Sequence, residues 1–146
     1  MNKIFLDFNI LLDLLDTKRT TSKETINFIK DLKANYKISF YTSSNFIYTT
    51  SFILRKHKNK EIIYKIKLLL EELELNLLDF KPNILTISEL FLDKTNLNDL
   101  EDILMIFTAI EYNCNFFLTN DKEILKNRKD FENSISIITP NEFTRK

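Results

Sequence analysis

The sequence contains no glycine among its 146 residues. Loops that cradle phosphate and turns that bind dinucleotides depend on glycine, because it allows positive φ and a close approach of the backbone to the ligand. A P-loop and a Rossmann fingerprint are therefore excluded. Any phosphate that this protein handles must be met by side chains, helix N-termini or a metal ion.

Cysteine and histidine are almost absent too, with only Cys114 and His57 present. A structural zinc site takes about four Cys or His ligands, and a disulfide takes two cysteines, so neither can form within this chain. The sequence also lacks an apolar signal segment and a long uncharged apolar run. We therefore expect a soluble cytoplasmic protein that has no membrane contact.

An excess of either charge is missing as well, since 21 basic residues balance 21 acidic ones. A simple polycationic nucleic-acid binder would be strongly basic. A nuclease is not excluded, because acids gathered at a metal site are offset by basic residues elsewhere, and a neutral total can conceal a polarised surface. The length and a hydrophobic content of 44% suit one domain over residues 1–146.

Predicted strands and helices alternate along the chain. Short apolar runs predict strands over 3–7, 37–42, 76–80, 115–119 and 135–138. Apolar residues at helical spacing predict helices over 10–15, 60–75, 82–92 and 99–113. Two further helices are predicted from capping residues. One begins after a cap at Thr20, Thr21 or Ser22, and the other runs from a cap at Ser43 or Ser44 to about 57. This alternation predicts an α/β fold with a parallel sheet, built from right-handed strand–helix–strand units.

Acidic residues follow two of the predicted strands and open one of the predicted helices. Asp7 ends the first strand, Asp121 follows the strand at 115–119, and Asp99 and Asp102 open the helix at 99–113. Ligands of open parallel sheets bind beyond the carboxyl ends of the strands. Three separate segments can therefore deliver acids to one edge of the sheet.

Each of these acids also has a structural interpretation. Asp99 can be an N-cap, and Asp121 can be a turn residue. Asp102 lies one turn into its helix, where a cap does not explain it. Asp7 follows a buried strand, where its charge costs desolvation unless a cation or another partner compensates. Clustered carboxylates repel one another without a cation, so the pattern favours an Mg²⁺ or Mn²⁺ site for phosphodiester hydrolysis.

Four segments resemble the motifs of the PIN-domain family, in the same order and at similar spacing. These segments are 5–13 (FLDFNILLD), 99–104 (DLEDIL) followed by Ala109, 114–121 (CNFFLTND) and 139–143 (TPNEF). The resemblance covers nearly the whole chain. It implies a three-layer α/β/α fold with a central parallel sheet of about five strands.

The resemblance also implies a function. It makes Asp7, Asp102 and Asp121 the metal-binding and catalytic acids, with Asp99 as a further metal-binding acid. Asn9 and Thr119 would shape the site. The implied activity is that of an Mg²⁺- or Mn²⁺-dependent endoribonuclease. Such proteins are frequently the toxin of a type II toxin–antitoxin pair, with RNA as substrate, an antitoxin protein as partner, and a homodimer as the working form.

The sequence departs from the family pattern at two places. Phe8 stands where a threonine is common. The family usually places a glutamate on the helix after the second strand, whereas residues 43–56 contain no acid and Thr49 falls near that position. Three aspartates still exceed the one or two carboxylates that Mg²⁺ commonly takes. A catalytically degenerate module that binds RNA or protein therefore stays open as the alternative, as does, more weakly, a DNA-directed nuclease or phosphatase.

Two basic runs are candidates for contacts with RNA phosphates. Arg55, Lys56 and Lys58 belong to the densest run, at 55–60, and Lys122 opens a second run at 122–129 that is closer in sequence to the proposed site. A solvated helix junction explains the first run equally well.

Overall fold

The computed structural model describes residues 1–143, so residues 144–146 of the predicted domain lie outside the described part. Five parallel strands form one sheet in the order β3-β2-β1-β4-β5. The strands are β1 (Asn2–Leu6), β2 (Ile38–Ser43), β3 (Asn76–Leu78), β4 (Phe116–Leu118) and β5 (Ser136–Ile138). The predicted α/β fold with a parallel sheet is confirmed, and β1 lies at the centre of the sheet.

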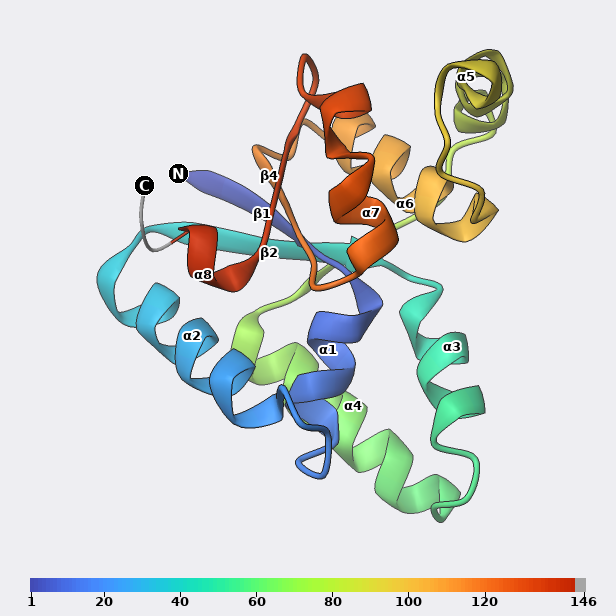
Figure 1. The fold of residues 1–146 in the computed structure, drawn as a ribbon. Helices are drawn as coiled ribbons and strands as arrows, with labels where there is room; N and C mark the ends of the chain where they lie inside the picture. Colours follow the sequence, from blue (N-terminus) through green and yellow to red (C-terminus); the bar gives the residue numbers. More distant parts are fainter. Residues whose placement is uncertain (144–146) are drawn as a thin grey trace.

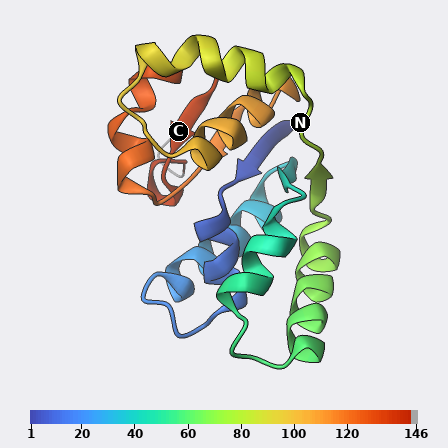
Figure 2. The same ribbon diagram turned by 90° about the vertical axis from the view of Figure 1, so that its right-hand side faces the viewer.

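Helices cover both faces of this sheet and make the three-layer arrangement that was expected (Figure 1; Figure 2). One layer contains α1 (Phe8–Leu15), α2 (Ser22–Asn35), α3 (Phe46–Ile53) and α4 (Asn59–Leu73). The other contains α5 (Asn83–Phe91), α6 (Leu100–Glu111) and α7 (Lys122–Lys126). The remaining short elements are η1 (Leu92–Lys94), η2 (Arg128–Phe131) and α8 (Pro140–Phe143). Across residues 1–143, no helix combines the length and apolar character that crossing a membrane requires.

The last three residues of β1 and all three of β4 are apolar, because helices cover both faces of the sheet there. Ile4, Phe5 and Leu6 of β1 are each 0% exposed. The ring of Phe5 stacks on that of Phe117, its partner in β4, with 5.2 Å between the ring centroids. This packing fixes the register of β1 against β4, and so fixes which residues meet at the carboxyl ends of the two strands.

The helix caps differ from those predicted. Thr21 precedes α2 at the expected place, but its hydroxyl donates hydrogen bonds to the carboxylate of Asp13 and does not cap the helix. The residue that precedes α3 is Asn45, so the predicted cap at Ser43 or Ser44 was wrong. The short helices α7 and η2 were not predicted.

Candidate active site

Asp7 lies at the carboxyl end of β1 and caps α1. Its side chain is 3% exposed; Oδ1 accepts a hydrogen bond from the N–H of Phe8 at 2.7 Å, and Oδ2 accepts one from the hydroxyl of Thr119 at 2.6 Å. Burial raises the pKa of Asp7 to about 6, although both hydrogen bonds act to lower it. Asn9 is half-buried in the first turn of α1. Asp7 is thus a buried carboxylate held in one fixed orientation.

Asp121 is tied to Asp7 through Thr119. The backbone N–H of Asp121 donates to the Thr119 hydroxyl at 2.9 Å. Asp121 also caps α7, since its Oδ1 accepts hydrogen bonds from the N–H groups of Glu123 and Ile124 at 2.9 and 3.1 Å. Among residues 1–143, its Oδ2 has no such donor. This carboxylate therefore has a structural role and still keeps one oxygen available for a ligand.

The start of α6 brings further acids to the same edge. Asp99 caps α6, with Oδ1 accepting from the N–H of Asp102 at 3.1 Å, which confirms its N-cap interpretation. Burial, and after it the charges of Asp99, Asp7, Asp121 and Glu101, together raise the pKa of Asp102 to about 7. The charges of four other carboxylates therefore reach Asp102, and three of these carboxylates are predicted acids.

Glu101 is an acid of this cluster that the sequence analysis missed. Its charge acts to raise the pKa of Asp7, and its own pKa is raised by partial burial and by Asp99. It lines a pocket of about 440 Å³ together with Thr49 and Asn45. Glu101 thus lies opposite the part of α3 where the resemblance expects an acid. Its position directly before Asp102 was the only signal in the sequence.

Asp99, Asp102 and Asp121 line a second pocket of about 520 Å³ on the other side of α6 from the pocket that Glu101 lines. The residues that line this acid pocket are Leu97, Asn98, Asp99, Asp102, Asp121 and Glu123. Carboxylate oxygens are hard ligands that suit Mg²⁺ or Mn²⁺, and a divalent cation would relieve the repulsion that raises the pKa of Asp102.

The acids do not form a closed set of metal ligands. In the part of the chain that the structure describes, no three His, Cys, Asp or Glu side chains are grouped closely enough to enclose a metal ion. Mg²⁺ takes only one or two carboxylates and keeps several waters. The donor atoms and the charge of the acid pocket therefore fit such an ion without a closed cage of protein ligands.

The first basic run does not lie among these acids. Arg55, Lys56 and Lys58 are exposed between α3 and α4, and Figure 1 shows α3 leading away from the carboxyl edge of the sheet toward this junction. The guanidinium of Arg55 lies 4.3 Å from the ring centroid of Phe52 and donates to the Phe52 carbonyl at 2.9 Å. Lys122, in contrast, directly follows Asp121 at the start of α7.

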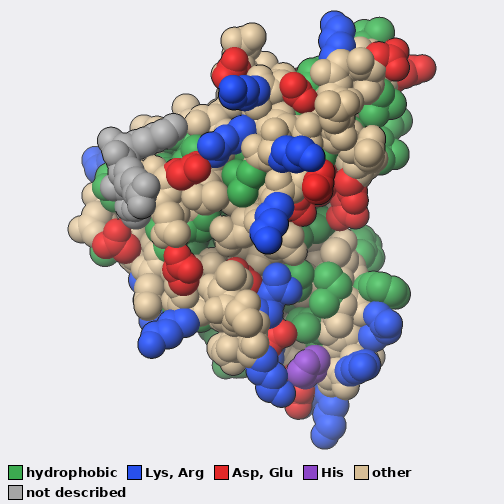
Figure 3. Space-filling model, viewed as in Figure 1, with side chains coloured by type: hydrophobic (Ala, Val, Ile, Leu, Met, Phe, Trp, Pro, Cys, Tyr) green, Lys and Arg blue, Asp and Glu red, His purple; other side chains and the backbone are tan. Residues whose placement is uncertain are grey.

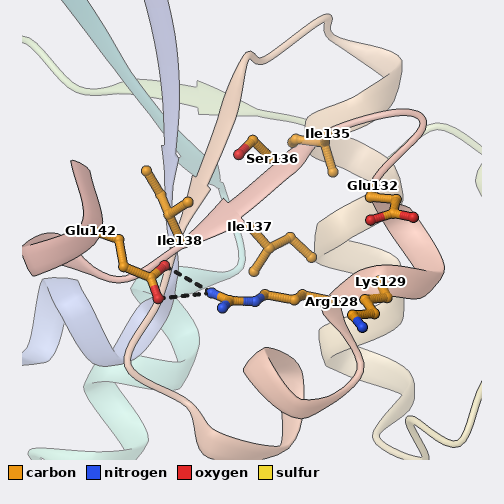
Figure 4. Close-up of a pocket in the computed structure, with 8 residues that line it drawn as sticks. All are labelled: Arg128, Lys129, Glu132, Ile135, Ser136, Ile137, Ile138 and Glu142. Atoms are coloured by element: carbon orange, nitrogen blue, oxygen red, sulfur yellow. Dashed lines mark hydrogen bonds and ion pairs between the residues drawn. The ribbon is translucent and has the colours of Figure 1, made fainter. Parts of the chain in front are cut away.

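Another pocket of about 520 Å³ lies along the edge strand β5 (Figure 4). The guanidinium of Arg128 reaches across it to the carboxylate of Glu142, with hydrogen bonds of 3.0 and 2.8 Å. None of the acids described above lines this pocket. It is therefore separate from the candidate active site.

The sequence and fold of the chain are similar to those of known proteins. The family model of the PIN domain matches residues 4–130. The chain is 32% identical over 142 residues to Ribonuclease VapC1 of Aquifex aeolicus (strain VF5), covering 97% of this chain and 92% of that protein.

Two solved structures share the fold. One is VapBC2 from Rickettsia felis bound to a DNA fragment from its promoter, with a TM-score of 0.67 at 20% identity, covering 94% of this chain and 98% of that one. The other is VapC20 of Mycobacterium tuberculosis, a Sarcin-Ricin loop cleaving toxin, with a TM-score of 0.64 at 13% identity, covering 84% and 93%. With the family model matched over most of its length, the chain belongs to the PIN-domain family.

Proposed function

We propose that this chain is a metal-dependent endoribonuclease that hydrolyses RNA phosphodiester bonds. The observation that carries this proposal is that Thr119 links the Asp7 carboxylate to the backbone of Asp121 at the carboxyl edge of the sheet, with Asp102, from a third segment, within reach of the charges of both. Burial, and after it repulsion from neighbouring acids, raise the pKa of Asp102 to about 7, and a bound cation would offset this repulsion. A relative named a ribonuclease, matched along nearly the whole chain, supports the same activity.

The proposed ion is Mg²⁺ or Mn²⁺, held by Asp7, Asp102 and Asp121. When bound, such an ion activates water and neutralises charge on the scissile phosphate. Thr119 keeps the carboxylate of Asp7 in one orientation and holds the backbone of Asp121 beside it. We further propose that Asp99, which caps α6 and lines the acid pocket, is a further metal-binding acid, and that Glu101 adds negative charge near the ion from the α3 side of α6.

We also propose that the chain acts as the toxin of a toxin–antitoxin pair, with a protein antitoxin as partner and a homodimer as the working form. The similar fold of VapBC2 and of a toxin that cleaves the sarcin-ricin loop supports the toxin role. Tyr48 and Phe52 on α3 and Tyr64 on α4 are 78%, 66% and 65% exposed. Such apolar surface is suited to contact with a protein partner.

Cleavage of RNA in Mn²⁺ by matched variants tests the activity. We expect Asp7→Asn and Asp102→Asn to lose cleavage by roughly a hundredfold or more and to lose Mn²⁺ binding in calorimetry. Asp31→Asn, which changes an exposed acid on α2, serves as the control and should behave like the parent. If Asp7→Asn cleaves RNA as fast as the parent protein, the assignment of the acids is wrong.

A catalytically degenerate PIN domain that binds RNA or protein is the second candidate. The absence of an acid in residues 43–56 favours it, as does the open geometry of the acids within the described residues. This candidate predicts no heat of Mn²⁺ binding even at millimolar metal. Tight Mn²⁺ binding that depends on Asp102 would exclude it.

A further inference from the structure

A polar groove of about 380 Å³ is lined by chain segments that directly adjoin those of the acid pocket. Residues 93–96 form one wall, and the same loop continues as residues 97–99 into the acid pocket. The other wall comes from 126–130, and Lys126 lies one turn after Glu123, which lines the acid pocket. Both walls therefore belong to segments that also line the acid pocket.

A hydrogen bond joins the two walls of this groove. The hydroxyl of Thr95 donates a hydrogen bond to Oδ2 of Asp130 at 2.7 Å, joining the loop before α6 to η2. Below this bond, three aromatic rings from α5, α6 and η2 pack with 4.9 to 5.9 Å between their centroids. These rings belong to Phe91, Phe107 and Phe131. The groove is thus held in shape before any ligand binds.

Three lysines line the groove, namely Lys94, Lys126 and Lys129. All three are exposed, and in residues 1–143 none of them forms an ion pair. Two acids, Asp93 and Asp130, also line it, and the carboxylate of Asp130 accepts the hydrogen bond from Thr95. Lys and Arg side chains gather over α7, beside a group of acidic side chains (Figure 3).

These lysines lie where positive charge would offset the repulsion between the acid pocket and an RNA strand. A polynucleotide carries one negative charge per phosphate, and the acids at the start of α6 and α7 repel it. Cations that are free and beside those acids can offset this repulsion. Two arginines are already engaged, since Arg128 pairs with Glu142 and Arg55 lies against Phe52.

We propose that this lysine groove, defined by Lys94, Lys126 and Lys129, binds the phosphates of an RNA strand on one side of the scissile bond. The strand then passes along α7 into the acid pocket. This inference rests on the proposed ribonuclease function and adds the path of its substrate. Because lysine contacts phosphate and not base edges, the groove contributes affinity that is independent of sequence.

Binding of a fluorescein-labelled single-stranded RNA of roughly ten nucleotides tests the groove. Fluorescence anisotropy is measured in EDTA, without divalent metal, over a range of KCl concentrations. The test variant carries Lys94→Gln, Lys126→Gln and Lys129→Gln. The matched control carries Lys18→Gln, Lys23→Gln and Lys30→Gln, which remove the same charge from exposed lysines in α2 and just before it.

We expect the groove variant to bind RNA roughly tenfold more weakly than the parent and to reduce the salt slope of log K by about 2, as expected for three lost phosphate contacts. The control should change affinity less than about threefold. Replacing the three groove lysines with arginine should preserve binding, because the charges remain. Unchanged circular dichroism of each variant establishes that it is folded.

Several results would contradict the proposal that the lysine groove binds RNA. They are an equal loss in both glutamine variants, a larger loss in the control, no loss in either, or no RNA binding by the parent at low salt. The ribonuclease proposal has a separate readout, which is cleavage of total cellular RNA by the parent in Mn²⁺. If the parent binds RNA through the groove but cleaves none, the proposed ribonuclease activity is wrong, whereas RNA binding by the groove is still supported.

Discussion

Thr119 donates a hydrogen bond from its hydroxyl to Oδ2 of Asp7 at 2.6 Å, across 112 positions of the sequence. The two residues follow β4 and β1, which pair in the centre of the sheet. The same hydroxyl accepts a hydrogen bond from the N–H of Asp121 at 2.9 Å. One side chain therefore positions two of the proposed metal ligands.

Thr119→Val should disrupt this arrangement, whereas Thr119→Ser should preserve it. Valine leaves a buried carboxylate oxygen without its donor, which costs about 1 to 3 kcal/mol of unfolding free energy and raises the pKa of Asp7 further. Urea denaturation measures the first effect, and Mn²⁺ titration at pH near 7 measures the second as weaker binding. Equal behaviour of the valine and serine variants in both measurements would contradict this role.

The raised pKa values of Asp7 and Asp102 predict that stability depends on pH and metal. Their folded values of about 6 and about 7 lie above the usual 3.8, so the folded state holds more protons than the unfolded state between about pH 4 and pH 7. Without metal, the free energy of unfolding should therefore fall as pH rises through this range. We expect a fall of about 2 to 3 kcal/mol from Asp7, and less from Asp102, which is more exposed to solvent.

Urea denaturation in EDTA at about pH 5 and about pH 8 measures this fall, and added Mn²⁺ should reverse it at the higher pH. Asp7→Asn removes the buried charge and should flatten the profile. A fall of the same size in Asp7→Asn would place its origin in other groups.

The parts of the site that depend on strand ends were predictable. Apolar runs mark buried strands, and an acid directly after such a run must lie at the carboxyl edge, as Asp7 does. Asp121 follows from the same rule. The helix α7 was missed because its five residues are too few for a periodic apolar pattern.

Other features depend on tertiary arrangement that a single sequence does not contain. Glu101 joins the cluster only because the start of α6 turns that side chain toward the α3 side, where it shares a pocket with Thr49. The dense basic run near Arg55 was a reasonable candidate by charge alone. The direction of α3 in the folded chain shows that this basic run lies away from the acids. Lys126, in contrast, lies near them.

A second buried acid, Asp13, has a structural role that the sequence analysis did not assign. It is 1% exposed and accepts hydrogen bonds from Arg19 at 2.7 Å, from Thr21 at 2.8 Å and from Thr25 at 2.8 Å, which join α1 to α2. Asp13→Ala leaves these donors without their acceptor, so we expect a loss of about 3 to 5 kcal/mol in urea denaturation. The exposed control Asp31→Ala should change stability by less than about 1 kcal/mol, and an equally small effect of Asp13→Ala would contradict the role.

Glu101 and Thr49 together test whether α6 supplies the acid that α3 lacks. Glu101→Gln should weaken Mn²⁺ binding roughly tenfold, because it removes one negative charge from the cluster. Adding Thr49→Glu to that variant should recover part of the affinity, since both side chains line the same pocket. Glu61→Gln, at the exposed start of α4, serves as the control. If Glu101→Gln binds Mn²⁺ like the parent, Glu101 does not contribute to metal binding and the aspartates act alone. If Thr49→Glu recovers no Mn²⁺ affinity, the two positions do not face the same ion.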